Sequence, residues 1–345
     1  MIVRSNALAL PLRDGCVDLV VTSPPYFALR SYRDGGAHYD GQVGSEETPA
    51  AFVDALLAAT SEMARVLKPT GSIFVNLGDK YAGSGGHNNG VYGVSGLHKE
   101  RAISPTAAAG RAVTATRRNA PDRYNQNSGG IPAKSLMGLP WRYAIGCIDQ
   151  LGLILRAEII WSKPNGLPES VTDRVRRSHE QWFHFTKQGD YFSAIDEVRE
   201  PHRDPSDDRP RMGPRARAMT GQAGNSSALN PLGKLPGSVW TLSTEPLIIS
   251  DEVQAHYNLP DHFAAFPQEW PRRLILGWCP PGGVVLDPFG GTGTVVMVAR
   301  ALGRVGFNGD LSRDYCRLAR WRIYQSGHAA KSEDRTWRDA QGVML

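Results

Sequence analysis

Two short stretches at opposite ends of the 345-residue chain carry residues that could do chemistry. In the first, an apolar run over residues 17–21 stops at Ser23-Pro24-Pro25-Tyr26. Prolines cannot extend a sheet ladder, so we expect a buried strand to end here. The rigid corner fixes one hydroxyl, one carbonyl and one aromatic ring in space. It is either a plain turn or part of a site.

The second stretch is a glycine-rich turn near the C-terminus, Asp287-Pro-Phe-Gly-Gly-Thr-Gly-Thr294, which follows an apolar run. In open α/β sheets, ligands bind beyond the carboxyl ends of strands, where glycines let a ligand approach the backbone. The turn matches neither a Walker motif nor a GxGxxG pattern. Asp287 would repel a pyrophosphate and attract a ligand that carries an amino group. The alternative is a strand-to-helix turn with a helix-capping aspartate.

A second acid, Asp310, stands at the tip of the next expected strand. An acid at such a position can accept hydrogen bonds from both hydroxyls of a ribose. An amine together with a ribose points to a nucleoside amino acid as the ligand.

The apolar pattern also predicts the elements that position these residues. Strands alternate with helices, which implies an α/β protein with a parallel sheet covered on both faces. Residues 1–10 look like a short lead-in, and Pro69-Thr-Gly71 is expected to stop the first helix. The expected strands cover 17–21, 72–77, 153–161, 179–185, 283–287 and 305–309, with order resuming at 238–240. The expected helices cover 49–68, 140–150, 267–277, 291–302 and 313–324.

Together, and in this order, the two motifs resemble those of the amino-group DNA methyltransferases that use S-adenosylmethionine (SAM). The turn at 287–294 resembles their SAM-binding DPFxGxGT motif, and the corner at 23–26 resembles their catalytic (D/N/S)PP(Y/F) motif. The catalytic motif comes first, which is the order of the β class. The segments 163–165, 237–240 and 262–267 also resemble sequence motifs of this family.

The resemblance implies the SAM-dependent methyltransferase fold, a mostly parallel, seven-stranded, doubly wound and Rossmann-like sheet in permuted order. SAM is the implied cofactor, and no metal is expected. Asp79, which ends the strand beside the catalytic one, is implied in SAM binding, and a plain Gly-Asp turn is the alternative. Phe289 is implied in the same role, and an apolar plug is the alternative. The residues implied in SAM binding are Asp287, Pro288, Phe289, Gly290, Gly291, Gly293, Thr294, Asp310, His262, Phe263, Ala264, Phe266, Pro267 and Asp79.

The serine of the corner bears on the target base. Within the resembled family, SPPY is most typical of enzymes that methylate N4 of cytosine, whereas DPPY and NPPY are more typical of N6-adenine enzymes. An exocyclic amine is a poor nucleophile, and acceptors at the Ser23 hydroxyl and the Pro24 carbonyl would localise its lone pair. Pro25 would hold the geometry and Tyr26 would stack on a base that has left the duplex.

Double-stranded DNA is the expected partner, and a net charge of +5 agrees weakly with a polyanionic ligand. For the lysine, arginine and asparagine candidates named below, a plain loop or a solvated charged surface is the alternative to a DNA contact. For Trp240 the alternatives are a place in the core or a cover for the adenine of SAM. The candidates for the base pocket or DNA are Lys163, Asn165, Trp240, Lys99, Arg101, Arg117, Arg118, Arg174, Arg176 and Arg177.

The chain divides by composition into six parts. Two irregular segments lie between the motifs, where β-class enzymes carry the variable region that reads the target sequence. The predicted parts are a catalytic part at 1–81, a basic DNA-contacting insert at 82–135, the continued methyltransferase domain at 136–195, a variable recognition segment at 196–236, a SAM-binding part at 237–326 and a polar tail at 327–345.

Other classes are disfavoured. No run reaches the roughly 18 apolar residues of a membrane span, we recognise no signal peptide, and the four cysteines are scattered, which fits a reducing cytoplasm. The open alternatives are an N6-adenine enzyme, an RNA or protein methyltransferase, and a subunit that binds SAM and DNA without turnover. A cognate restriction endonuclease is a candidate partner, and the oligomeric state is open.

Overall fold

The computed structural model describes residues 1–28, 41–83, 129–166, 168–202, 230–258 and 266–324, and the backbone of 33–34 and 37–38. Within these ranges no helix is long and apolar enough to cross a membrane.

One eight-stranded sheet organises the described chain, in the order β1-β10-β9-β2-β5-β7-β6-β8. β7 runs antiparallel to both of its neighbours, and the other paired strands are parallel. The predicted α/β class with a mostly parallel sheet is therefore confirmed. The strands are β1 (Ile2–Arg4), β2 (Val17–Thr22), β5 (Leu67–Leu77), β6 (Ile154–Ser162), β7 (His179–Thr186), β8 (Val239–Thr241), β9 (Val284–Asp287) and β10 (Val305–Asp310). A separate two-stranded sheet pairs β3 (Arg33–Asp34) with β4 (Ala37–His38).

The expected count of seven strands is wrong by one. The segment expected as a lead-in contains β1, which pairs with β10 at the edge of the sheet. Three residues are too few to show a period, so the pairing depends on the strand it joins.

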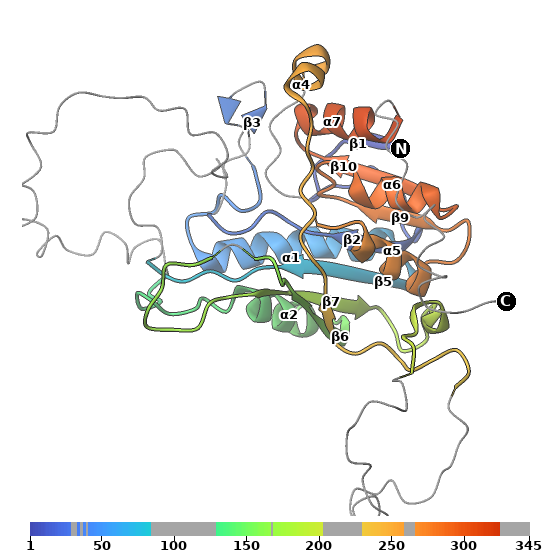
Figure 1. Cartoon of the computed structure of the whole chain (residues 1–345), viewed down its shortest axis with the longest axis horizontal. Helices are drawn as coiled ribbons and strands as arrows, with labels where there is room; N and C mark the ends of the chain where they lie inside the picture. Colours follow the sequence, from blue (N-terminus) through green and yellow to red (C-terminus); the bar gives the residue numbers. More distant parts are fainter. Residues whose placement is uncertain are drawn as a thin grey trace, which may run out of the picture.

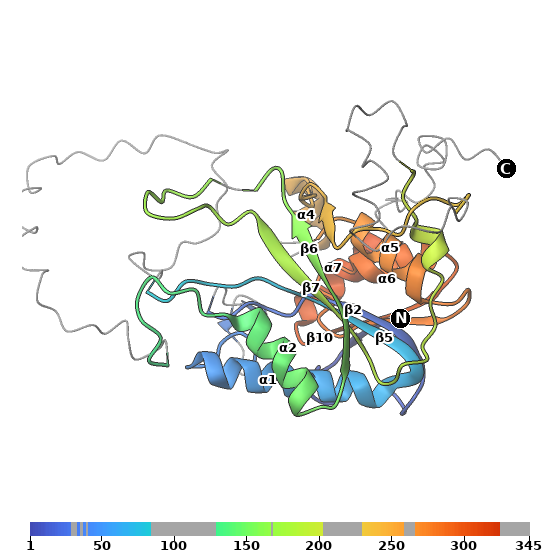
Figure 2. The same cartoon turned by 90° about the horizontal axis from the view of Figure 1, so that it is seen from below.

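Helices cover both faces of the sheet (Figure 2). α1 and α2 pack on one face, and α5, α6 and α7 lie on the other. Their bounds are α1 (Pro49–Val66), α2 (Leu139–Asp149), α5 (Glu269–Trp278), α6 (Thr294–Ala301) and α7 (Arg313–Tyr324). Two short helices were not predicted, the 3-10 helix Ile195–Val198 and α4 (Asp251–Tyr257).

α1 shows why the sequence signals mark its start better than its end. The Thr48 hydroxyl accepts a hydrogen bond from the Ala51 amide at 3.2 Å, and Pro49 occupies the first turn, as expected for an N-cap. The helix ends at Val66, and the chain passes directly into β5. The segment 69–71, expected to stop the helix, therefore lies inside β5.

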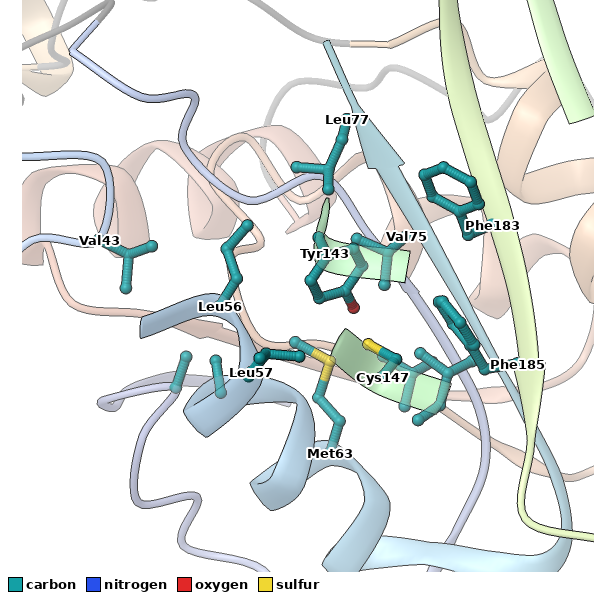
Figure 3. Close-up of a cluster of buried hydrophobic side chains, with 14 of the residues drawn as sticks. Val43, Leu56, Leu57, Met63, Val75, Leu77, Tyr143, Cys147, Phe183 and Phe185 are labelled. Carbon is teal, nitrogen blue, oxygen red and sulfur yellow. The ribbon is translucent and has the colours of Figure 1, made fainter. Parts of the chain in front are cut away.

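Two apolar cores stabilise the faces of the sheet. In the first, side chains of α1 and of strands β5 and β7 converge around Tyr143 and Cys147 of α2 (Figure 3). The Tyr143 hydroxyl bonds to Thr60 at 2.8 Å, so its burial leaves no unpaired hydroxyl. In the second core, the Trp182 and Trp240 rings each stack on Trp270 with centroids 4.8 Å apart.

Candidate active site

The corner after β2 stands in the middle of the sheet. β2 lies between β9, which carries the glycine-rich turn, and β5 (Figure 1). Because these three strands are parallel, their carboxyl ends meet at one edge. The first and last parts of the chain therefore come together at the predicted site.

A hydrogen bond links the two motifs directly. Thr22, the last residue of β2, donates its hydroxyl to Asp287 Oδ1 at 2.7 Å, and the bond is buried. The Phe289 amide donates to the same oxygen at 3.2 Å. Sequence reasoning missed Thr22, because its only signal is its place immediately before Ser23.

The polar side of the corner faces β5 and β7. Ser23 Oγ donates to Asn76 Oδ1 at 3.3 Å, and the Tyr26 hydroxyl lies 2.9 Å from both Asn76 Oδ1 and Glu180 Oε2. Gly78 packs closely against the Tyr26 ring, since a Cβ there would lie 2.7 Å from a ring carbon. The corner is thus held by side chains of two neighbouring strands.

Lys163 extends this network to β6. Its ammonium bonds to Glu180 Oε1 at 2.5 Å and lies 4.0 Å from the centroid of the Trp161 ring. Of these residues, sequence reasoning selected Lys163 but neither Asn76 nor Glu180. Glu180 is the second residue of β7. Because β7 runs antiparallel, its amino end lies where the parallel strands have their carboxyl ends. The direction of a strand could not be read from the sequence pattern.

The glycine-rich turn is shaped by close contacts. The Gly290 amide donates to the Gly309 carbonyl at 2.8 Å, and a Cβ at Gly290 would collide with the Asn308 side chain. Gly293 has a φ of 75°, a left-handed conformation that favours glycine. From behind the turn, Arg322 of α7 donates to the hydroxyl of Thr294 at 2.6 Å.

The two predicted acids lie at adjacent strand tips. Asp310 accepts hydrogen bonds from the Gly291 amide at 2.9 Å and the Ser312 amide at 2.8 Å, so it joins the turn to the start of α7. Burial raises the pKa of Asp287 to about 7, and Asp310 adds to the rise, while the hydrogen bonds from Thr22 and Phe289 lower it. A cationic ligand would relieve this cost by favouring the charged carboxylate.

The acids at this edge fit the chemistry of SAM. Asp287 is a buried acid and Asp310 a half-buried one at the next strand tip, and their roles toward the amino group and the ribose stay predictions. Beneath the turn, Asn308 is fully buried, and neither of its side-chain polar atoms has a hydrogen-bond partner within the described ranges. Buried polar atoms without partners are rare in native proteins and call for an explanation such as a missing ligand or water.

Asp79 has a local structural role. Its carboxylate accepts hydrogen bonds from the Gly138 and Leu139 amides at 2.9 and 3.1 Å, which satisfies amides at the start of α2. Arg177 lies 4.0 Å from the same carboxylate. A contact of Asp79 with SAM stays a prediction.

The remaining predicted residues divide by location. Trp240 is buried in the second core, where its Nε1 donates to the Gly237 carbonyl at 2.8 Å. Phe266 packs edge-on against Trp182, and Pro267 is buried near the start of α5.

The candidate DNA contacts that the structure describes have partners within the protein. Asn165 exchanges hydrogen bonds with the backbone of Thr244. Arg174 pairs with Glu169 at 2.7 Å, and Arg176 donates to a backbone carbonyl. Outside the described residues lie Lys99, Arg101, Arg117, Arg118, His262, Phe263 and Ala264. Among the described residues, no three His, Cys, Asp or Glu side chains gather as a metal site would.

The α/β fold and the meeting of the two motifs at one edge of the sheet agree with the class of SAM-dependent methyltransferases that the sequence resembles. Comparison with known proteins narrows the class. A sequence profile of the N6/N4 family, described as DNA methylase, matches residues 17–320. The chain is 34% identical over 306 residues to the Type II methyltransferase M.SmaI of Serratia marcescens, covering 89% of this chain and 84% of that protein. It is 33% identical over 308 residues to M.Cfr9I of Citrobacter freundii, covering 89% and 81%.

Among solved structures, the PvuII DNA methyltransferase (cytosine-N4-specific) superposes with a TM-score of 0.58 at 19% identity, covering 95% of this chain and 88% of that one. This likeness shows a shared fold. The chain belongs to the N6/N4 family of DNA methyltransferases.

Proposed function

We propose that this protein transfers a methyl group from SAM to the exocyclic N4 of a cytosine flipped out of double-stranded DNA. The observation that carries the proposal is the hydrogen bond from Thr22 to Asp287. It joins the Ser23 corner to Asp287, the carboxylate that we expect to bind the amino group of SAM. The serine supports cytosine over adenine as the target. N6-adenine methylation is the alternative outcome.

The residues of the corner have separate tasks. When bound, SAM supplies an electrophilic methyl group on a sulfonium. The Ser23 oxygen and the Pro24 carbonyl accept hydrogen bonds from the target amine, which localises the nitrogen lone pair toward that methyl group. Pro24 and Pro25 hold these acceptors in place before the base arrives. Tyr26 stacks on the base.

The reaction is a direct displacement. No cysteine nucleophile is required, and the proton that leaves the methylated amine is acidic enough to pass to solvent. Asp287 binds the amino group of SAM and Asp310 the ribose. The Type II relatives suggest a restriction–modification setting, with a site-specific DNA target and a cognate endonuclease as partner.

Competition among DNA, RNA and peptide for labelled methyl groups tests the substrate class, and DNA should take nearly all of the label. In the same assay, Ser23→Ala should retain SAM binding and lose activity by about a hundredfold or more, the range for removing one oriented polar group. Turnover near the wild-type rate in that variant would remove Ser23 from the mechanism.

A further inference from the structure

The Tyr26 hydroxyl faces more acceptors than it can satisfy at once. A phenol has one proton to donate, yet Asn76 Oδ1 and Glu180 Oε2 both lie 2.9 Å from its oxygen. Asn76 Oδ1 is also the acceptor that Ser23 Oγ reaches, at 3.3 Å. The two hydroxyls of the corner therefore reach one amide oxygen, whose two lone pairs can accept both, but each hydrogen bond is weaker when the oxygen is shared.

The orientation of the Asn76 amide is fixed. Its Nδ2 donates to the Gln181 carbonyl at 3.1 Å across the β5–β7 pair, and the residue is 1% exposed. Because a backbone carbonyl can only accept a hydrogen bond, the amide nitrogen of Asn76 must face Gln181, and Oδ1 must face the corner. The amide of Asn76 therefore cannot turn its nitrogen toward either hydroxyl.

Glu180 determines which acceptor receives the single Tyr26 proton. Its other oxygen binds the Lys163 ammonium, and both side chains are 18% exposed, so the carboxylate is held and partly shielded from water. A carboxylate is a stronger acceptor than a neutral amide oxygen. The Tyr26 proton therefore goes to Glu180, and Asn76 Oδ1 is left for the proton of Ser23.

We infer that Glu180, held by Lys163, is a positioning residue that keeps Ser23 in its accepting state. A serine whose proton is committed to Asn76 presents only lone pairs to the target amine. If Tyr26 also donated to Asn76 Oδ1, the shared oxygen would hold the Ser23 proton more weakly. That proton would then turn more readily toward the substrate, and the hydroxyl would meet an N–H with its own donor. The inference rests on the proposed function, because it gives the Ser23 acceptor a cause.

A double-mutant cycle between Glu180→Gln and Tyr26→Phe tests the inference. Glu180→Gln should lower the single-turnover methyl-transfer rate by about tenfold, a modest change in barrier height, with the Kd for SAM and the Tm nearly unchanged. In the Tyr26→Phe background no phenolic proton needs directing, so the same substitution should change the rate by less than about twofold. Glu62→Gln, in an ion pair with Arg65 on α1, is the matched control and should leave the rate unchanged.

Equal costs of Glu180→Gln in the two backgrounds would overturn the inference. If Glu180→Gln does not fold, Lys163→Met takes its place in the cycle. Lys163→Met should lower the methyl-transfer rate in the wild-type background and change it little in the Tyr26→Phe background. An equal decrease in both backgrounds would again overturn the inference. Ser23→Ala in the same assay separates the two failures. Near wild-type activity of Ser23→Ala refutes the proposed role of Ser23, whereas an inactive Ser23→Ala with an additive cycle refutes the role of Glu180 alone.

Discussion

The affinity for SAM should fall as the pH falls, because the buried Asp287 must lose a proton to bind the amino group. Burial raises the pKa of this carboxyl to about 7 in the free protein. A folded-state acid with a raised pKa is protonated below that value, and binding of a cation requires the ionised form. Full affinity is therefore present above pH 7 and is lost as the pH decreases through it.

The size of the effect follows from this pKa. If the bound carboxylate titrates well below pH 6, the apparent Kd scales as one plus the ratio of protonated to ionised Asp287 in the free protein. With a pKa of about 7, Kd should rise about eightfold between pH 7.5 and pH 6.0. The comparison stops at pH 7.5 because an α-amino group such as that of SAM itself titrates near 8.

Isothermal titration calorimetry gives both Kd and the number of protons released. About 0.9 protons should leave on binding at pH 6.0, measured from buffers of different ionisation enthalpy. Asp287→Asn, which cannot titrate, is the control and should bind weakly with little pH dependence. A Kd that is equal at pH 6.0 and pH 7.5 would refute the assignment of the amino group to Asp287. The same would follow if the Kd of Asp287→Asn depended on pH as strongly as that of the wild-type protein.

Two substitutions and one deletion give further predictions. Thr22→Val removes a donor that lowers the pKa of Asp287, so SAM binding should weaken and its pH midpoint should move up, both measured in the same titrations. Gly293→Ala forces a side chain into a left-handed φ with its Cβ 2.8 Å from Ile323, and should lower stability by about 1–3 kcal/mol in denaturant unfolding; an unchanged midpoint would contradict the strain. Deletion of 82–133 should abolish DNA binding and retain SAM binding, and unchanged DNA affinity would place recognition elsewhere.

Much of the fold could be predicted because its signals are local. The apolar run that ends at Asp287 defines its strand, and α7 follows from the spacing of its apolar residues. The meeting of the two motifs followed from the rule that ligands bind at the carboxyl edge of a parallel sheet.

The rest depended on pairing that the local sequence does not carry. Glu180 reaches the site because β7 runs antiparallel, and nothing in its composition shows its direction. Asn76 reads as one polar residue in an apolar strand, and its role appears only when β2 and β5 lie side by side. Trp240 is equally suited to a pocket or a core, and packing against Trp270 decides its place.

The most direct test of the proposed function is the identity of the methylated nucleoside. Duplex DNA would be incubated with the protein and labelled SAM, digested to nucleosides and analysed by mass spectrometry, with Ser23→Ala as the matched control. The Ser23 corner predicts N4-methyldeoxycytidine from the wild-type protein and almost none from the variant. N6-methyldeoxyadenosine, or label that Ser23→Ala incorporates equally well, would contradict it.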